Sequence, residues 1–175
     1  WDYYVFFSIA FYTGLRKGEI FALKWSDIKD NYLSVSRSIT QKLKGADRET
    51  PPKNKSSVRT LQIPKPLIKI LNEHKARYKT NSHFTDNFRI CGGERPIRDS
   101  SVTRANELIA KAAGIKKIRI HDFRHSHVSL LANEGINIQE IARRLGHSNI
   151  EMTWNTYSHL YPREEERAVE ILNKI

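Results

Sequence analysis

Two histidines, an arginine and a tyrosine in the last third of the chain have the types and order needed to hold a phosphodiester while a hydroxyl attacks it. They are His121, Arg124, His147 and Tyr157, within HDFRHSHVSLLANEGINIQEIARRLGHSNIEMTWNTYSHLYP. A guanidinium and an imidazole can hydrogen-bond phosphate oxygens, and a phenol can act as a covalent nucleophile. The set therefore favours cutting and rejoining of DNA as the leading hypothesis.

Cationic side chains far upstream complete this set. Arg16 lies in TGLRKGE, and PPKNKSS offers Lys53 and Lys55. An arginine presents its planar fork to two phosphate oxygens, which a lysine cannot do, so Arg16 and Arg124 are expected to clamp one phosphate together. Glu19, three residues after Arg16, can orient that arginine by accepting a hydrogen bond. Alternatively, the two form a plain surface ion pair of little energetic value.

The HDFRHSH segment also admits other interpretations. His121 and Arg124 are three residues apart at an expected helix start, which suits an anion, but a capped helix with a solvated arginine has the same pattern. His125 and His127 add a metal hypothesis, because His121 and His125 are four residues apart. We expect no zinc site, because the glutamate of an HExxH motif is missing and no third ligand clusters nearby.

The tyrosine stands out by its position. Tyr157 is one of seven tyrosines, and a tyrosine usually buries its ring with its hydroxyl at the surface. Here Gly146 turns the chain, His147 is expected to face a cleft, and Tyr157 follows ten residues later on a short helix. Tyr161 is a second candidate nucleophile, although its place directly before Pro162 favours a helix end.

Apolar spacing predicts the elements that must position these side chains. Residues 1–12 are apolar almost all round, which predicts a buried helix ending at Gly14 and puts Arg16 at a helix boundary. KGEIFALKW predicts a second short helix. YLSVSRSI and SVRTLQIP alternate in polarity and predict a small antiparallel sheet, joined by a mobile, lysine-rich loop over 41–57. Further helices are predicted at 65–78, 101–113, 122–134 and 137–145, with Asp122 as a cap and Gly114, Gly135 and Gly146 at the ends, whereas 79–98 gives no clear pattern.

The fold class predicted from these elements is mainly α with a small antiparallel β-sheet, that is, α+β. A length of 175 residues suits a single domain, 1–175, with its own hydrophobic core. The chain begins with Trp1 and holds one methionine, Met152, so we expect a fragment of a longer protein whose amino-terminal DNA-binding domains lie outside it.

The charge balance indicates the kind of partner. Lys and Arg number 30 against 19 Asp and Glu, a net charge of +11 spread over both halves of the chain. Such a surface favours nucleic acid over a membrane, because each neutralised phosphate releases condensed counterions, although a merely soluble basic surface would have the same charge. The single cysteine, Cys91, cannot form an internal disulfide, and the chain has no apolar run long enough to span a membrane. These features predict a reducing, cytoplasmic setting.

Several motifs together resemble a known family. TGLRKGE, the lysine-bearing hairpin, HDFRH, LGH and NTYSHLYP follow in this order over nearly the whole chain. They resemble the catalytic domain of the tyrosine recombinases, the phage lambda integrase family, and within it the integrases of phages and conjugative transposons of Gram-positive bacteria. The resemblance implies the DNA breaking-rejoining fold and an active site of Arg16, Lys53, His121, Arg124, His147 and Tyr157, with Glu19 as a supporting acid. The PK-x-K-S-S form points to Lys53, with Lys55 as the alternative.

The reaction expected of such a site is site-specific recombination, for integration or excision of a mobile element. Tyr157 would attack a DNA phosphorus and form a covalent 3′-phosphotyrosyl intermediate. One phosphodiester is exchanged for a phosphotyrosyl bond of similar energy, so we expect neither ATP nor any other cofactor. We also expect no metal, because side-chain cations stabilise the charge.

Each side chain has an expected role in that reaction. Arg16 and Arg124 would stabilise the charge on the non-bridging oxygens, and His147 would donate a further hydrogen bond. Lys53 is the expected general acid for the 5′-hydroxyl leaving group, and His121 is expected to help accept the phenol proton. The expected partners are double-stranded DNA, further copies of the chain in a homo-oligomer such as a tetramer on DNA, and accessory proteins that bend DNA or set the direction of recombination. The expected location is the cytoplasm of a bacterium or a phage-infected host.

Two other functions fit part of the sequence. NIQEIARRLGHSNIEM has the helix, glycine turn and helix of a helix-turn-helix regulator, which would explain the charge but leaves Arg16, Lys53 and Tyr157 without a role. A type IB topoisomerase would share the chemistry but would not pair two DNA sites. The last segment, REEERAVEILNKI, has apolar residues on one helical face and is expected either to pack in cis or, as we favour, to dock on a neighbouring subunit.

Overall fold

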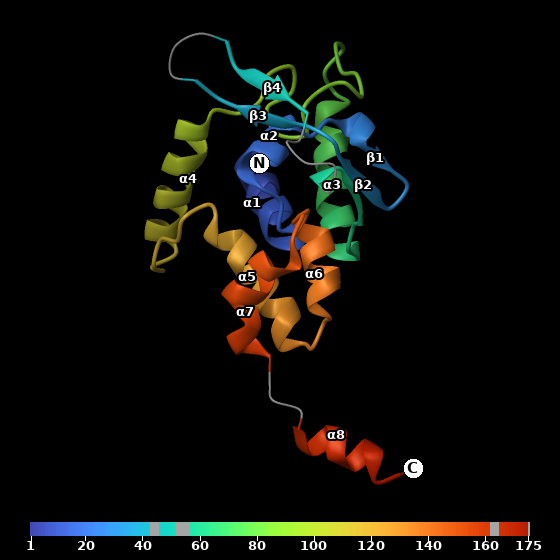
Figure 1. Cartoon of the computed structure of the whole chain (residues 1–175). Helices are drawn as coiled ribbons and strands as arrows, with labels where there is room; N and C mark the ends of the chain where they lie inside the picture. The colour runs from blue at the N-terminus through green and yellow to red at the C-terminus, as the bar shows by residue number, and fades with distance from the viewer. Residues whose placement is uncertain (43–45, 52–56, 162–164, 175) are drawn as a thin grey trace.

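The computed structural model describes residues 1–42, 46–51, 57–161 and 165–174 of the chain. Helices surround a small sheet and a hairpin (Figure 1), which confirms the predicted α+β class. The helices are α1 (Asp2–Thr13), α2 (Lys17–Ala22), α3 (Lys65–Tyr78), α4 (Asp99–Ala112), α5 (Asp122–Asn133), α6 (Ile138–Leu145), α7 (Ile150–Tyr157) and α8 (Glu165–Leu172). The strands are β1 (Ile28–Lys29), β2 (Tyr32–Val35), β3 (Ser38–Thr40), β4 (Arg48–Thr50) and β5 (Arg59–Gln62). None of the described helices is both long and apolar enough to cross a membrane.

The three-stranded sheet has the order β1-β2-β5 with antiparallel pairs, as the alternation of polarity predicts. Leu33 pairs with Leu61 and both are buried, because every second side chain of a strand points to the same face. The expected single strand over YLSVSRSI is divided between β2 and β3 near Arg37, whose guanidinium binds the carboxylate of Asp27 at 2.5 and 2.6 Å.

Strand β4 was not predicted, because it lies within the stretch expected to be a loop. It pairs with β3 to form a two-stranded hairpin. Its residues are polar and none of them is buried, so no apolar alternation marks it in the sequence. Side-chain ion pairs fix it instead, because Glu49 binds Arg37 at 3.3 Å and Arg89 at 2.5 Å.

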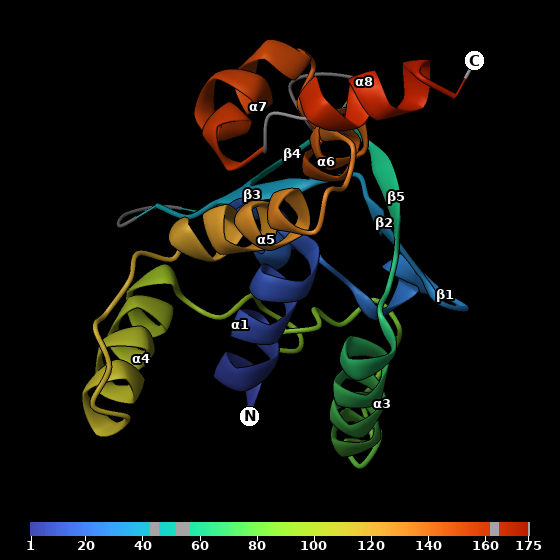
Figure 2. The ribbon, with the colours of Figure 1, turned by 90° about the horizontal axis from the view of Figure 1, so that it is seen from below.

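Two hydrophobic cores lie on either side of the residues of interest. The larger core joins α1, α2, α3, the sheet and the start of α4. The smaller core joins α5, α6 and the end of α7 through five buried residues, which are Val128, Ala132, Ile141, Leu145 and Tyr157. Helix α1 links the two, because Phe7 stacks on Phe123 at 5.2 Å between ring centroids and His127 Nδ1 bonds the carbonyl oxygen of Phe11 at 2.8 Å. Figure 2 shows α5 lying across the end of α1.

Two helix-ending glycines direct the chain into the region between the cores. Gly14 follows α1 with φ +66°, and a Cβ there would lie 2.7 Å from Cδ2 of His127. Gly146 follows α6 with φ +66°, and a Cβ there would lie 2.7 Å from Nη1 of Arg59. Both positions need a left-handed backbone and a close approach, which only glycine allows without strain.

The start of α5 differs in detail from the prediction. Asp122 was expected to cap this helix, but α5 begins at Asp122 and its N-cap residue is His121. The Asp122 carboxylate turns back and accepts the backbone N–H of Arg119 at 2.9 Å, and it also pairs with the Arg119 guanidinium. Asp122 therefore fixes the turn before the helix and leaves the imidazole of His121 exposed beside its first turn.

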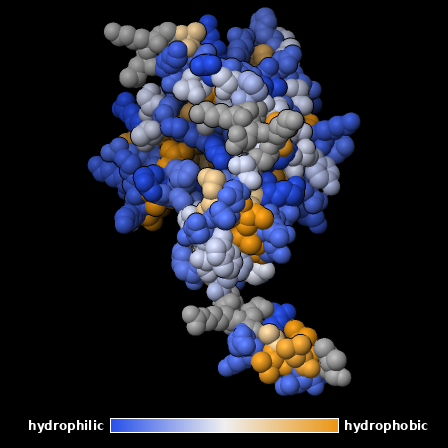
Figure 3. Space-filling model, in the orientation of Figure 1, coloured by the Kyte–Doolittle hydropathy of each residue, from blue (hydrophilic) through white to orange (hydrophobic). Residues whose placement is uncertain are grey.

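Helix α8 is the amphipathic helix predicted for the last segment. None of its residues is buried, and Figure 1 shows it beyond the rest of the molecule. Figure 3 shows hydrophobic side chains gathered on the visible face of α8. Val169, Ile171 and Leu172 of this helix are exposed. The expected alternative of packing in cis is therefore not adopted here.

Candidate active site

The predicted residues come from segments far apart in the chain and meet at the junction of the two cores. Arg16 lies between α1 and α2, Arg124 lies in the first turn of α5, His147 follows α6, and Tyr157 ends α7. Carbonyl oxygens at the carboxyl ends of α1 and α6 supply negative partial charge that orients Arg124.

Arg124 is held between the carboxyl ends of two helices. Its guanidinium donates hydrogen bonds to the carbonyl oxygen of Gly14 at 2.7 Å and to that of Leu145 at 2.9 Å. A cation at a helix carboxyl end is favourable, because the last carbonyl groups lack partners within the helix. Burial, followed by the charge of Arg16, lowers the pKa of Arg124 to about 9, which still leaves it charged at pH 7.

Arg16 reaches the same point from the other side. As the N-cap residue of α2 it donates its backbone N–H to Glu19 Oε2 at 2.8 Å, and its Nη1 lies 3.3 Å from Glu19 Oε1. Nη1 also lies 3.5 Å from the carbonyl oxygen of Leu145, which Arg124 binds too. With its side chain 40% exposed, Arg16 is partly open to solvent beside the buried Arg124.

Glu19 belongs to a buried ion pair that was not predicted. Its two carboxylate oxygens accept hydrogen bonds from Nη1 and Nη2 of Arg59, each at 3.0 Å, and both side chains are less than 5% exposed. Burial alone would raise the pKa of Glu19, but the hydrogen bonds and charges of Arg59 and Arg16 lower it overall. The expected supporting role of Glu19 toward Arg16 thus has a geometric basis, and a plain surface pair is excluded by its burial.

Arg59 links this pair to the turn that carries His147. Its Nε donates to the carbonyl oxygen of Arg144 at 2.6 Å and its Nη1 to that of Ser57 at 2.9 Å. Arg59 lies at the start of β5, in SVRTLQIP. The sequence nearby holds other lysines and arginines, so the charge of Arg59 alone does not distinguish it. Its only signal in the sequence is an inward position in an alternating strand, which is unusual for a charged residue.

His147 faces Arg124 across the junction. Its Nε2 lies 2.8 Å from Nη2 of Arg124, and its Nδ1 lies 2.7 Å from Oγ1 of Thr153. Burial, followed by the charges of Arg124 and Arg16, lowers the pKa of His147 to about 4, so the ring is neutral at pH 7. An arginine can only donate, so Nε2 accepts and the proton lies on Nδ1, toward Thr153.

The phenol of Tyr157 turns toward α5. Its ring belongs to the smaller core, with the residue 7% exposed, and its hydroxyl bonds Nδ1 of His125. His121 does not reach the hydroxyl in this arrangement but contacts the ring of His125, with the centroids 4.8 Å apart. Burial raises the pKa of Tyr157, while the charge of Arg124 acts in the opposite direction. The second candidate, Tyr161, donates its hydroxyl to the carbonyl oxygen of Ile136 at 2.8 Å.

Lys53 and its alternative Lys55 lie outside the described residues. The residues after them are anchored at the site, because the Ser57 hydroxyl lies 3.4 Å from the carbonyl oxygen of Gly146 and Arg59 follows two residues later. Ser57 therefore lies next to the turn that carries His147.

Hollows border the site on two sides. One of about 430 Å³ lies between β5 and α6 and reaches Arg59 and His147. Another of about 390 Å³ lies between α2 and the start of α5 and reaches His121, with Lys17 and Arg119 in its wall. Arg59 lines the first hollow and Lys17 and Arg119 line the second, so cationic side chains border both, as a phosphate site requires.

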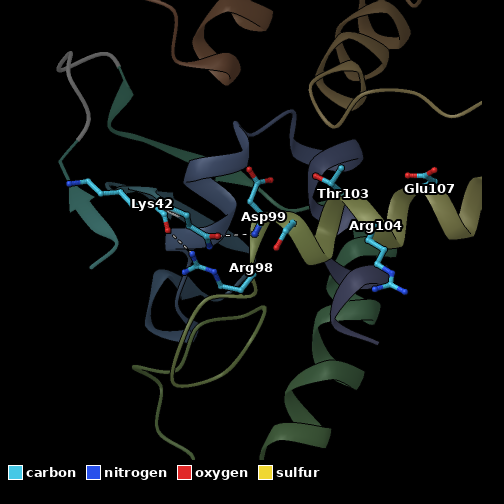
Figure 4. Close-up of a pocket in the computed structure, with 8 residues that line it drawn as sticks. Lys42, Arg98, Asp99, Thr103, Arg104 and Glu107 are labelled. Atoms are coloured by element: carbon cyan, nitrogen blue, oxygen red, sulfur yellow. Dashed lines mark hydrogen bonds between the residues drawn. The ribbon is translucent and has the colours of Figure 1, made fainter. Parts of the chain in front are cut away.

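A third hollow, of about 450 Å³, lies between the β3-β4 hairpin and the start of α4 (Figure 4). Arg98 donates to the carbonyl oxygen of Lys42 and forms a bidentate pair with Asp47, each at 2.9 Å, and Gln41 accepts the backbone N–H of Asp99 at 2.8 Å. These bonds fix the hairpin against α4. None of the predicted catalytic residues that are described lines this hollow.

The metal hypothesis for the histidines finds no support in the geometry. Nδ1 of His127 binds a carbonyl oxygen beneath the site, and burial lowers the pKa of His127 to about 4. Over the described parts of the chain, no group of three His, Cys, Asp or Glu side chains could hold a metal ion.

Comparisons with known proteins identify the family. A family model described as "Phage integrase family" matches residues 1–164. The chain is 36% identical to the ICEBs1 integrase of Bacillus subtilis and 33% identical to a XerC-like tyrosine recombinase of Caldanaerobacter subterraneus; each match covers 97% of this chain and 48% of the relative. The chain thus spans about half the length of these relatives.

Solved structures show the same fold. The Tn1549 transposon integrase in complex with a circular intermediate DNA superposes with a TM-score of 0.79 at 22% identity, over 98% of this chain and 58% of the other. The catalytic domain of bacteriophage HP1 integrase superposes with a TM-score of 0.61 at 24% identity, over 95% of this chain and 79% of the other.

Proposed function

The chain belongs to the phage integrase family, and from this premise we propose that it is the catalytic domain of a site-specific recombinase. It cuts and rejoins double-stranded DNA through a covalent 3′-phosphotyrosyl intermediate, and it serves the integration or excision of a mobile element. The observation that carries this proposal is the meeting of Arg16, Arg124 and His147 at one point, with Tyr157 on the adjoining helix. A helix-turn-helix regulator would need no such convergence.

The scissile phosphate binds between the two arginines. Arg124 is already bound to carbonyl oxygens and cannot turn away, while Arg16 is partly open to solvent. Such fixed donors stabilise the charge that gathers on the non-bridging oxygens without having to reorganise during the reaction. No metal ion enters this scheme.

His147 must change its hydrogen bonding when DNA binds. Without DNA its Nε2 accepts from Arg124, but a phosphate oxygen needs a donor there. A phosphate placed between the two removes the Arg124 hydrogen bond and favours a proton on Nε2. The hydroxyl of Thr153, which can either donate or accept, allows the neutral ring to exchange tautomers.

The leaving group is protonated by Lys53, with Lys55 as the alternative. Support comes from Ser57, two residues after Lys55, whose hydroxyl lies 3.4 Å from the carbonyl oxygen of Gly146. The 5′-hydroxyl that forms is later the nucleophile that rejoins DNA. The bond energy is kept in the phosphotyrosyl linkage, so no ATP is consumed.

Assembly of several copies on DNA is the second part of the proposal. Helix α8 has an apolar face and no buried residue. We expect a second copy of this chain to cover that face, because recombination of two sites requires several copies on DNA. We expect a homo-oligomer such as a tetramer, acting in the cytoplasm with accessory DNA-bending or directionality proteins. A type IB topoisomerase acts without pairing sites and gives such a helix no partner.

The test uses a nicked suicide duplex that carries the native site. The protein should form a denaturant-resistant adduct with DNA, and Tyr157→Phe should bind DNA without forming it. Binding with no adduct from the unmodified protein would instead indicate a regulator. Removal of residues 164–175 should spare the adduct and abolish the pairing of two sites; intact pairing would contradict the role of α8.

A further inference from the structure

The hydroxyl of Tyr157 has a partner that the expected site does not include. Tyr157 Oη bonds Nδ1 of His125, and the two rings lie 5.7 Å apart between centroids. His125 directly follows Arg124 in the chain, so one turn of α5 presents both a phosphate-binding guanidinium and an imidazole that contacts the nucleophile. His121 was expected to take the phenol proton, but it contacts the ring of His125 instead.

We propose that His125 is a catalytic residue that holds the hydroxyl of Tyr157 and takes its proton as the oxygen attacks phosphorus. This inference rests on the proposed function, because it needs Tyr157 as the nucleophile. A neutral imidazole with its proton on Nε2 has Nδ1 as an acceptor for the phenol. His121, which lies edge-on to the same ring, is then a positioning residue.

The step balances without any further reactant. The Oη–H bond of Tyr157 breaks and its proton goes to Nδ1 of His125, while Oη forms the new bond to phosphorus. The bond from phosphorus to the 5′ oxygen breaks, and that oxygen receives a proton from the proposed general acid, Lys53. Rejoining reverses the transfer, so that His125 returns the proton to the departing phenol.

The surroundings of the phenol explain why a base in contact is needed. Tyr157 is only 7% exposed, and burial raises its pKa, so a free phenolate is disfavoured before attack. Transfer of the proton as the new bond forms avoids that intermediate. The hydrogen bond also selects one orientation of the ring, which holds the oxygen beside the turn of α5 that carries Arg124.

Charged and titratable groups near His125 come from two helices, α5 and α7. Helix α5 contributes His121, Asp122 and Arg124, and α7 contributes Tyr157. Asp122 is bound to Arg119 on the outer side of the turn. The proton acceptor therefore directly follows, in the chain, the cation that is proposed to bind the phosphate, and it contacts the phenol that attacks.

The test measures single-turnover cleavage of the suicide duplex by the intact protein. His125→Ala should lower the rate about 100-fold, a typical contribution of a general base. His125→Asn places an acceptor oxygen near the position of Nδ1 but cannot take the proton, so it should recover only part of the loss. Ser126→Ala, an exposed neighbour on α5, should cleave like the unmodified protein.

A substrate with sulfur in place of the 5′-bridging oxygen distinguishes activation of the nucleophile from protonation of the leaving group. Sulfur leaves without a proton, so this substrate should rescue Lys53→Ala but not His125→Ala. DNA binding and thermal unfolding of each variant check that it is folded. If the unmodified protein forms an adduct and His125→Ala cleaves at the same rate or faster, or is rescued by sulfur, the inference is wrong. If the unmodified protein forms no adduct, the proposed function itself fails.

Discussion

The two sides of the site differ in how their reactive groups are held. On the arginine side, which comprises Arg16, Glu19, Arg59 and Arg124, charged groups bind each other and helix carbonyl oxygens across long distances in sequence. On the tyrosine side, which comprises His121, His125 and Tyr157, one described hydrogen bond and contacts between rings hold the hydroxyl. Buried charged groups therefore hold the arginine side, whereas a hydrogen bond and ring contacts hold the tyrosine side.

This difference matches the work that each side is proposed to do. Donors that stabilise a transition state act best when they need not reorganise, so the arginines are fixed before DNA arrives. A nucleophile that becomes joined to DNA must leave its hydrogen bond and follow the strand end. Loss of a contact on the arginine side should therefore lower the stability of the fold, whereas loss of a contact on the tyrosine side should lower mainly the rate of the reaction.

Removal of Arg59 should give the largest loss of stability. Arg59→Met leaves the carboxylate of Glu19 buried without its main partner, so the free energy of unfolding should fall by about 3–5 kcal/mol. Denaturant titration measures this loss. The double variant with Glu19→Gln should recover much of it, because no buried charge is then unpaired. His125→Asn on the tyrosine side should cost little stability. Equal losses of stability from the two sides would contradict the proposed difference between them.

Acid should weaken the protein through the histidine beneath the arginine side. The pKa of His127 is lowered to about 4 from an unfolded value of 6.5, so the unfolded state binds more protons between these values. The stabilising effect of the neutral ring is complete above pH 6.5 and declines as the pH falls toward 4, by roughly 2 kcal/mol at pH 4.5.

Urea titrations at pH 7 and pH 4.5 test this point. His127→Asn keeps a donor for the carbonyl of Phe11 and cannot titrate, so its stability should fall less between the two pH values. Burial, followed by the charge of His125, also lowers the pKa of His121, but this position is exposed, so His121→Asn should reduce the pH dependence less than His127→Asn does. A larger effect from His121 would reverse the expected order.

A third prediction concerns the glycine turn against Arg59. Gly146→Ala meets both a left-handed backbone and Arg59, whereas Gly135→Ala has φ +75° and nothing within 4 Å of its Cβ. The strained backbone costs about 1–2 kcal/mol at either position. Gly146→Ala should lose more than that and should also slow cleavage, because the turn carries His147. Equal melting temperatures and cleavage rates for the two variants would show that the contact with Arg59 is unimportant.

Much of the fold could be predicted because apolar periodicity marks buried faces. The helix over 65–78 was predicted to the residue, and the glycines after α1, α4 and α6 end their helices as expected. Strand β4 could not be predicted, because ion pairs and backbone pairing hold it instead of apolar side chains. The cap assigned to Asp122 was wrong, because its carboxylate serves the preceding turn.

The candidate site was predictable only as far as residue types go. The motifs named Arg16, Arg124, His147 and Tyr157, but their roles stay predictions. Arg59 and His125 were missed because their importance comes from partners far away in sequence, Glu19 and Tyr157, that only the folded chain brings into contact. Such partners have no fixed spacing that a sequence could reveal.

The most direct test of the central claim removes charge from the substrate. A suicide duplex with a methylphosphonate at the scissile position has lost the negative charge that Arg16 and Arg124 are proposed to share. Arg16→Ala and Arg124→Ala should both be slow on normal DNA, and both should approach the rate of the unmodified protein on the neutral linkage. If the neutral linkage rescues only one of them, or neither, the two arginines do not act on one phosphate and the account is contradicted.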